Sequence, residues 1–446
     1  MPRSYINKLR PFAAARPAFL DGGDTPRAFL ERCLEVIEAR DGEVKAFVTL
    51  NIDQARAAAD ESAKRYGGNR PLSLVDGCPV AVKDIIDTAD MATEMNSKVR
   101  EGHRPKADAA CVHALRRGGA IILGKTVTTE FACGVSGPTT NPYDAARTPG
   151  GSSSGSAASV GAGMVPIGLG TQTAGSLIRP ASYNGTYAIK PSFGAINLGG
   201  VHPVCGTRDH LGVLGGTLED TWRTAHHISA VGGSAPGYAG LAGGGELSPA
   251  RKPRRLAILR LGGWQETDEK SRAAFNALME SLRAAGVELL DPESDQDLAA
   301  LDAAALDVET PARDIMCYEM RWPFQAYLDA GHKLSETITG YLDHAKEVTP
   351  AMYAEALTRR DEARARFAAY ASEVDAFVTL SSSGPAPLDH AFTGSRAFQT
   401  AWSVIGFPAI NLPLLEVDGL PLGVQVMGFD GADDALAAAA RWIDEL

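Results

Sequence analysis

Residues 149–191 form an unusual segment that is rich in glycine, serine and alanine, and three of its serine hydroxyl groups are the candidates for chemistry: Ser152, Ser153 and Ser176. The segment does not have the composition of a flexible linker, because it also contains apolar pieces such as residues 164–167 that can be buried. Small residues let backbone segments pack closely and leave amide N–H groups open towards a reacting atom. Hydroxyl groups beside open amides could serve as nucleophiles at a carbonyl carbon, provided that a base lies next to them.

Two short motifs in this segment resemble the signature of the amidase signature family. Residues 150–156 read Gly-Gly-Ser-Ser-Ser-Gly-Ser, and residues 170–176 read Gly-Thr-Gln-Thr-Ala-Gly-Ser. Ser152 and Ser176 lie 24 positions apart, which is the spacing in that family. The wording is closest to the malonamidase-like branch, and the resemblance extends over most of the chain, with a looser match over residues 240–370.

The resemblance implies a Ser-Ser-Lys triad that hydrolyses amides. It identifies Ser176 as the nucleophile and Ser152 as a proton relay that follows a cis peptide bond. The base would be Lys83, in the Gly-x-Pro-x-x-x-Lys-Asp element of residues 77–84. A lysine with the ordinary pKa of about 10.4 would be cationic and useless as a base, so Lys83 has to be buried, as the apolar residues before it suggest. The alternative is a lysine that pairs with Asp84 at the end of a strand.

The same resemblance implies groups that bind the oxyanion and the substrate. The backbone N–H groups of Thr173, Ala174 and Gly175, together with that of the nucleophile, would form an oxyanion hole. Ala174 replaces the usual glycine, which would cause strain only in a left-handed backbone, and we expect no such strain. Ser153 is expected to contact the substrate. Arg179 would pair with a substrate carboxylate, and the alternative is an arginine that binds backbone carbonyl groups.

Other interpretations of these residues are weaker. Residues 151–155 fit the G-x-S-x-G nucleophile elbow with Ser153 at its centre, but no strand pattern precedes them. Asp209 and His210 could suggest a Ser-His-Asp triad, but adjacent residues on a turn seldom fill both roles, and we expect them to anchor a loop. A phosphate-binding loop would need a following Walker A lysine or a GxGxxG pattern, and the sequence has neither. A non-catalytic scaffold is disfavoured because all three triad positions are filled.

Composition and charge narrow the class of protein further. The 446 residues are 45% hydrophobic and 22% charged, which is typical of a globular protein. A net charge of −11 argues against binding to nucleic acid or to an anionic membrane. The first residues lead into no apolar signal, and no run of about 18 apolar residues appears, so we expect a cytoplasmic protein. Six scattered cysteines without a CxxC pair predict reduced thiols, and we expect no metal site and no cofactor.

Strand patterns and helix patterns alternate along the chain. Apolar runs predict strands at residues 46–50, 77–82, 120–125, 256–259, 375–380, 406–413 and 419–428. Helical spacing, with Thr25 and Pro26 as a start signal, predicts helices beginning at residue 26 and at 51–65, 109–117, 270–285 and 432–446. This alternation favours the α/β class. The resemblance implies the amidase signature fold, a mixed twisted β-sheet covered on both faces by helices.

We expect one domain over residues 1–446, with a core at 65–230 and 375–446 and a variable helical cap at about 295–373. The predicted reaction is hydrolysis of the C–N bond of a linear amide to an acid and ammonia or an amine. The alternatives are a protein similar to the ammonia-delivering A subunit of a glutamine-dependent amidotransferase, or a hydrolase of a related ester, carbamate or hydrazide. The expected partner is a small-molecule amide, and family members suggest a homodimer. Pocket walls are expected from the loosely matching middle and from residues 126–134.

Overall fold

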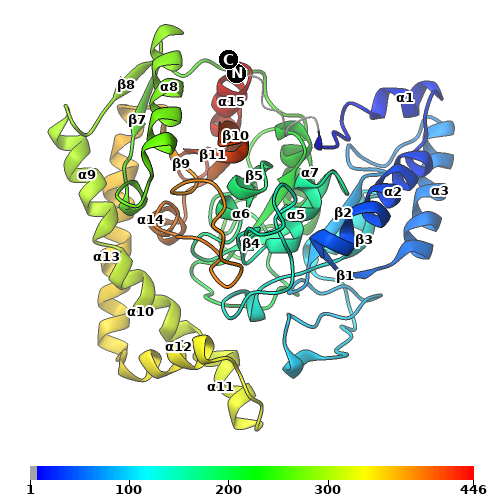
Figure 1. Cartoon of the computed structure of the whole chain (residues 1–446), viewed down its shortest axis with the longest axis horizontal. Coiled ribbons are helices and arrows are strands. Elements are labelled where there is room, and N and C mark those ends of the chain that lie inside the picture. The colour runs from blue at the N-terminus through cyan, green and yellow to red at the C-terminus, as the bar shows by residue number, and fades with distance from the viewer. Residues whose placement is uncertain (1–7) are drawn as a thin grey trace.

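A mixed β-sheet of eleven strands runs through residues 8–446, the part of the chain that the computed structural model describes (Figure 1). The strand order is β1-β3-β2-β4-β6-β5-β10-β11-β9-β7-β8. Strand β2 is parallel to β3 and β4, and β7 is parallel to β8 and β9, whereas the other neighbours are antiparallel. The strands are β1 (Phe47–Leu50), β2 (Pro79–Lys83), β3 (Ile121–Thr126), β4 (Ile167–Gln172), β5 (Tyr187–Lys190), β6 (His210–Gly215), β7 (Arg255–Ile258), β8 (Glu288–Leu290), β9 (Ala376–Leu380), β10 (Ala409–Val417) and β11 (Leu420–Met427).

Around strands β2, β3 and β6, two hydrophobic cores lie on opposite faces of this sheet, because successive side chains of a strand point to opposite faces. In β2, Val80 and Val82 belong to one core and Ala81 belongs to the other. Helix α5 (Ser154–Gly161) packs in the core of Ala81, and helix α4 (Ala110–Arg117) packs in the opposite core. Lys83 projects from the same face as Ala81, so it points towards α5, the helix that begins directly after the first serine motif.

The remaining helices of the sheet-containing part confirm most of the predicted elements. The predicted helix start at Pro26 is confirmed, because the Thr25 side chain accepts a hydrogen bond from the amide of Ala28. Sequence patterns missed two helices that are nearly or wholly buried, α6 and α14, and the helix α7. The helices are α1 (Arg16–Asp21), α2 (Pro26–Val44), α3 (Ile52–Gly67), α6 (Ile178–Tyr183), α7 (Leu218–Gly232), α8 (Glu269–Ala284), α14 (Thr400–Ile405) and α15 (Asp433–Asp444).

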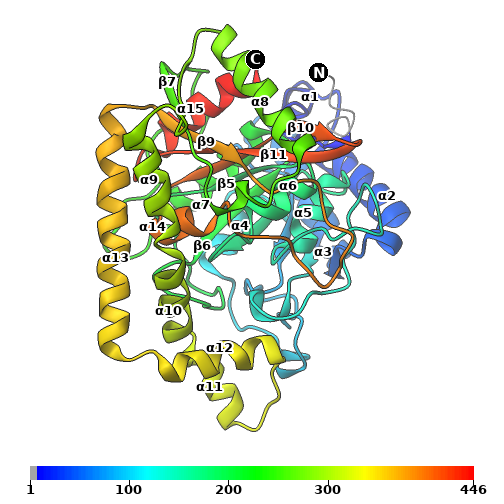
Figure 2. The ribbon, with the colours of Figure 1, turned by 60° about the vertical axis from the view of Figure 1, so that its left-hand side comes forward.

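A run of helices without strands follows β8, as the polar helical pattern of this region predicts. Figure 2 shows α13 along one edge of the molecule, with α10, α11 and α12 beside its lower end. The division of the chain into a core and a variable cap stays a prediction. Within residues 8–446, no helix combines the length and the apolar composition needed to cross a membrane. The helices of the run are α9 (Gln296–Leu306), α10 (Glu309–Glu319), α11 (Arg321–Asp329), α12 (Glu336–Glu347) and α13 (Pro350–Ala369).

Candidate active site

A buried lysine lies against the first serine motif. Lys83 is the last residue of β2 and is fully buried. Its Nζ lies 2.7 Å from the Oγ of Ser152 and 2.7 Å from the Oγ1 of Thr171, to which it donates hydrogen bonds. Burial lowers the pKa of Lys83 to about 7, although the carboxylate of Asp209 acts in the opposite direction. The Lys83 amine can therefore lose its proton near neutral pH.

The alternative pairing of Lys83 with Asp84 is wrong. Asp84 forms an ion pair with Lys125, with 3.1 Å between Oδ1 and Nζ, and both side chains are buried. In the register of β2 and β3, Val82 lies opposite Lys125 and Lys83 lies opposite Thr126, so the two lysines project from opposite faces of the sheet. Among the described residues, no ion pair within 4.0 Å involves Lys83. Lys125 therefore pairs with the carboxylate of Asp84, and Lys83 contacts Ser152 without an ion-pair partner among residues 8–446.

The peptide bond before Ser152 is cis, as the resemblance implies. The carbonyl oxygen of Gly151, which belongs to this bond, accepts a hydrogen bond of 2.5 Å from Nη2 of Arg179, and the same Nη2 donates to Oγ1 of Thr393 at 3.1 Å. Arg179 is 5% exposed, and its burial lowers its pKa to about 10. The bond to the carbonyl oxygen is the structural role that the sequence left as an alternative to a substrate carboxylate.

The loop that carries Ser176 is held by the side chain of Gln172. The Oε1 atom of Gln172 accepts hydrogen bonds of 3.0 Å from the amides of Leu177 and Ile178, and its Nε2 donates to Oγ of Ser403. The carbonyl oxygen of Ser176 in turn accepts a hydrogen bond of 3.1 Å from the amide of Ser153, which follows Ser152. These bonds tie the two serine motifs together at the end of β4.

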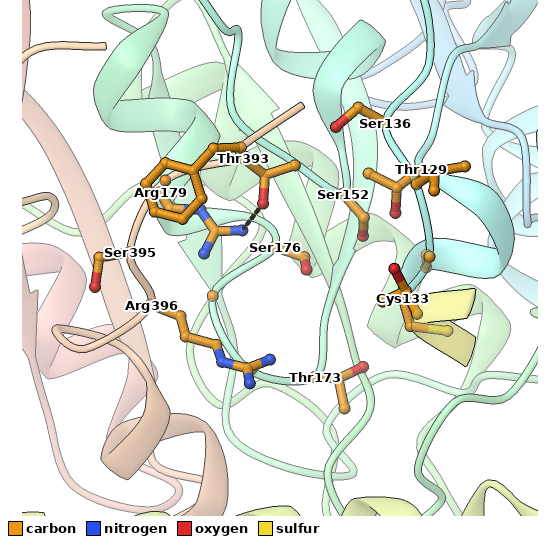
Figure 3. A pocket seen from close by; sticks show the side chains of 18 of the residues that line it. Thr129, Cys133, Ser136, Ser152, Thr173, Ser176, Arg179, Thr393, Ser395 and Arg396 are labelled. Atoms are coloured by element: carbon orange, nitrogen blue, oxygen red, sulfur yellow. Dashed lines mark hydrogen bonds between the residues drawn. The ribbon is translucent and has the colours of Figure 1, made fainter. Parts of the chain in front are cut away.

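The hydroxyl groups of Ser152 and Ser176 line one cavity, and Figure 3 shows both side chains at its wall. Ser152 is 3% exposed. The structure records no hydrogen bond between these two hydroxyl groups of the described chain. The contact between Lys83 and Ser152 is thus observed, while the step from Ser152 to Ser176 stays a prediction.

The backbone around Ala174 carries no strain from its Cβ. Ala174 is absent from the residues between 8 and 446 that adopt positive φ angles, so the replacement of glycine costs nothing in backbone energy. Within the same residues, the amides of Thr173, Ala174, Gly175 and Ser176 donate no backbone hydrogen bond outside regular elements. All four residues line the cavity. These N–H groups are therefore free to donate to a group bound in the cavity, and their role as an oxyanion hole stays a prediction.

Two other predicted roles are resolved by the positions of the side chains. The hydroxyl group of Ser153 lies against the backbone of Thr171, 3.2 Å from both its N and its O, and Ser153 is fully buried outside the cavity wall. This side chain braces the loop, which corrects the expected substrate contact. The carboxylate of Asp209 accepts hydrogen bonds from Oγ1 of Thr173 and from the amides of Val204 and Cys205. The expected anchoring role of Asp209 is confirmed.

The cavity has a volume of about 1000 Å³. As predicted, residues 129–134 and the helical middle of the chain contribute to its wall, the latter through Met316 of α10 and Tyr341 of α12. Sequence reasoning missed a third wall, the irregular segment 381–399 between β9 and α14, which we call the strap. Its residues 390–396 line the cavity, and Figure 3 shows Thr393, Ser395 and Arg396 on one side. Only a local enrichment in serine, glycine and proline marks the strap in the sequence.

Comparison with known proteins places this geometry in a family. A family model described as Amidase matches residues 28–437, so the chain belongs to the amidase family. The A subunit of glutamyl-tRNA(Gln) amidotransferase from Mycobacterium bovis is 36% identical over 287 residues, which are 60% of this chain and 58% of that relative. The matched part thus spans less than two thirds of the relative. The corresponding protein of Koribacter versatilis is 29% identical over 453 residues, 93% of each chain.

Solved structures share the fold. A crystal structure of an amidase superimposes with a TM-score of 0.84 and 26% identity, covering 98% of this chain and 99% of the other. The peptide amidase from Stenotrophomonas maltophilia superimposes with a TM-score of 0.75 and 25% identity, covering 100% and 98%. The amidase signature fold is therefore confirmed, whereas the malonamidase-like branch stays a prediction.

Proposed function

We propose that this chain hydrolyses a linear carboxylic amide to an acid and ammonia or an amine, through an acyl-enzyme on Ser176. The observation that carries the proposal is the buried Lys83, whose Nζ lies 2.7 Å from Oγ of Ser152. Burial disfavours the ammonium form, so a neutral amine is present near pH 7 and can act as a general base. A lysine with an ordinary pKa could not accept a proton there.

In the acylation step, Oγ of Ser176 attacks the carbonyl carbon and its proton passes through Ser152 to Nζ of Lys83. The carbonyl oxygen becomes an oxyanion that accepts hydrogen bonds from the amides of residues 173–176. When the C–N bond breaks, the proton returns from Lys83 through Ser152 to the nitrogen, which leaves as neutral ammonia or amine. The acyl group stays on Ser176 as an ester.

In the deacylation step, a water molecule replaces the amine. Its proton follows the same path to Lys83 while its oxygen attacks the acyl carbon. The proton then returns to Oγ of Ser176 as the acid leaves. The same groups can act on esters, carbamates and hydrazides, since each has a carbonyl carbon and a leaving group that needs a proton.

A second candidate is the ammonia-supplying component of a glutamine-dependent amidotransferase. The names of the Mycobacterium bovis and Koribacter versatilis relatives favour it. It would use the same steps on the side-chain amide of glutamine. Release of ammonia from glutamine by the purified chain, in preference to every other small amide tested, would favour this candidate over a stand-alone amidase.

The experiment that tests the main proposal is a panel of small aliphatic, aryl and acidic amides with Ser176→Ala as the blank. We expect the intact chain to release ammonia or amine from at least one class and the variant to release none. Mass spectrometry of the chain quenched during turnover should show the acyl mass on a peptide that contains Ser176. Hydrolysis that survives in Ser176→Ala would contradict the assignment of the nucleophile.

A further inference from the structure

The cavity wall is positively charged although the chain is acidic. Of the described residues that line it, Arg179 and Arg396 carry guanidinium groups, and Glu266 alone carries a carboxylate. Glu266 forms no ion pair within 4.0 Å with either arginine among the described residues. Two positive charges thus face the space beside Ser176 in a chain whose net charge is −11. A wall of this kind favours a ligand with a negative charge.

The two arginines are not equivalent. Nη2 of Arg179 donates to the carbonyl oxygen of Gly151 and to Oγ1 of Thr393, and the side chain is 95% buried. Removal of this group would leave the carbonyl oxygen of the cis peptide without its donor, next to Ser152. The first task of Arg179 is therefore to position that peptide.

Arg396 has a free guanidinium group on a fixed backbone. Its carbonyl oxygen accepts hydrogen bonds from the amides of Gln399 at 2.9 Å and Thr400 at 3.0 Å, where the strap enters α14. Its guanidinium group makes no hydrogen bond or ion pair with any described residue, and the side chain is exposed where it lines the cavity. A guanidinium group in this state is available for a bidentate contact with a carboxylate.

Arg396 also lies beside the nucleophile. A Cβ atom placed on Gly175 would come within 3.3 Å of the Cβ atom of Arg396, so this side chain starts next to the residue that precedes Ser176. Figure 3 shows the guanidinium groups of Arg179 and Arg396 on one side of Ser176 and Ser152 on the other. In the proposed mechanism Ser152 faces the leaving nitrogen. The acyl half of the substrate would then occupy the part of the cavity that lies on the Arg396 side of Ser176.

From this geometry, and on the basis of the proposed function, we propose that Arg396 selects the substrate by binding a carboxylate on the acyl half of the amide. Arg179 then acts as a positioning residue for the Gly151–Ser152 peptide. The substrate class is the half-amide of a dicarboxylic acid, and the products are a dicarboxylate and ammonia or an amine. This assigns the carboxylate contact to the strap, in place of the arginine that the sequence motif indicates.

The test compares substrates that differ only in charge. Malonamate, succinamate and glutaramate are each paired with the neutral methyl ketone of the same length, such as 4-oxopentanamide for succinamate. Ammonia release gives kcat and KM for the intact chain, Arg396→Gln, Arg396→Lys, Arg179→Lys and Arg283→Gln. The last variant is the matched control, since it removes one positive charge from the exposed surface of α8.

We expect the intact chain to prefer one carboxylate substrate over its neutral partner by roughly 10- to 100-fold in kcat/KM, the range for a hydrogen bond to a charged group. Arg396→Gln should remove this preference through a higher KM for the carboxylate substrate alone, and Arg396→Lys should retain part of it. Arg179→Lys should lower kcat for both members of a pair and leave the preference intact. The control should behave as the intact chain does.

The opposite pattern would overturn the assignment. If Arg396→Gln lowers the rates on both members equally, or if Arg179→Lys alone removes the preference, Arg396 does not bind the carboxylate. A second measurement separates this failure from a failure of the proposed function. Succinate or malonate should raise the melting temperature of the intact chain and not that of Arg396→Gln, whether or not any amide is hydrolysed. Equal shifts in both proteins would contradict the anion site itself.

Discussion

Two regions of the molecule contribute to the same cavity and are built in opposite ways. Residues 149–191 contain only two charged side chains, Arg179 and Lys190, and nearly every residue there is buried. The helices α9–α13 carry many charges and alternate between buried and exposed positions, and they reach the cavity only through a few side chains such as Met316 and Tyr341. The first region carries Ser152 and Ser176 on a closely packed, buried backbone, and the second shapes the space around them. Substitutions should therefore act differently in the two regions.

The largest effect is expected from the removal of the buried base. Lys83→Met should lower kcat/KM for amide hydrolysis by about 10³- to 10⁴-fold, because the relay then has no proton acceptor. The free energy of unfolding of the Lys83→Met variant should be unchanged or higher, since an apolar side chain replaces a buried amine that has no ion pair with a described residue. Steady-state kinetics and urea unfolding of the same preparation check both statements. A large loss of stability would indicate that Lys83 is structural.

The second buried lysine provides the matched contrast. Lys125→Met should lower the free energy of unfolding by about 3–5 kcal/mol, because Asp84 is left as an uncompensated buried charge. The double variant that also changes Asp84 to Asn should recover part of this loss. Urea unfolding measures both. If Lys83→Met and Lys125→Met lose equal stability, the two lysines do not have the different roles assigned to them.

The pH dependence should report the base directly. Burial lowers the pKa of Lys83 to about 7, so kcat/KM should fall about tenfold for each pH unit below that value. The unfolded chain, with an ordinary lysine pKa, binds more protons than the folded chain between about pH 7 and 10. The contribution of this group to stability therefore rises with pH across that window. A profile that is flat between pH 5 and 7, or a stability slope that Lys83→Met leaves unchanged, would contradict a neutral Lys83.

Gly155, in the buried region 149–191, is closely surrounded by backbone atoms. A Cβ atom on Gly155 would lie 2.2 Å from the carbonyl oxygen of Ala46 and 2.5 Å from the amide nitrogen of Val127, so Gly155→Ala should cost about 1–3 kcal/mol or more. It should also disturb activity, since α5 follows the first serine motif.

The smallest effect is expected in the helical region. A Cβ atom on Gly340, in the middle of α12, meets no atom within 4 Å, so Gly340→Ala should stabilise the protein by about 0.5–1 kcal/mol. The change should not alter kcat. Thermal or urea unfolding measures this effect and the Gly155→Ala effect on the same scale. Equal tolerance at the two positions would remove the contrast between the regions.

Much of the fold could be predicted because its signals are local. The start of α2 at Pro26 depends on a capping residue directly before it, and the strands β2, β3, β9 and β11 appear as short apolar runs. Helices α6 and α14 were missed because they are short and wholly buried and show no amphipathic period. Strand β8 was missed because it has only three residues at the edge of the sheet.

For the site, the sequence alone determined the motif that brings serines, a lysine and open backbone amides into one chain, because their types and spacing are local properties. Only the tertiary structure decided four further points. It showed that Lys83 and not Lys125 is without an ion pair within residues 8–446, and that Arg179 binds the carbonyl oxygen of Gly151. It also showed that Ser153 contacts the backbone, and that the strap brings Arg396 to the cavity. These facts depend on contacts between residues far apart in the chain: Lys83 and Ser152 are separated by 69 positions, and Arg179 and Thr393 by 214. Spacing along a chain does not specify such contacts, since they follow from how the sheet and its connecting segments pack.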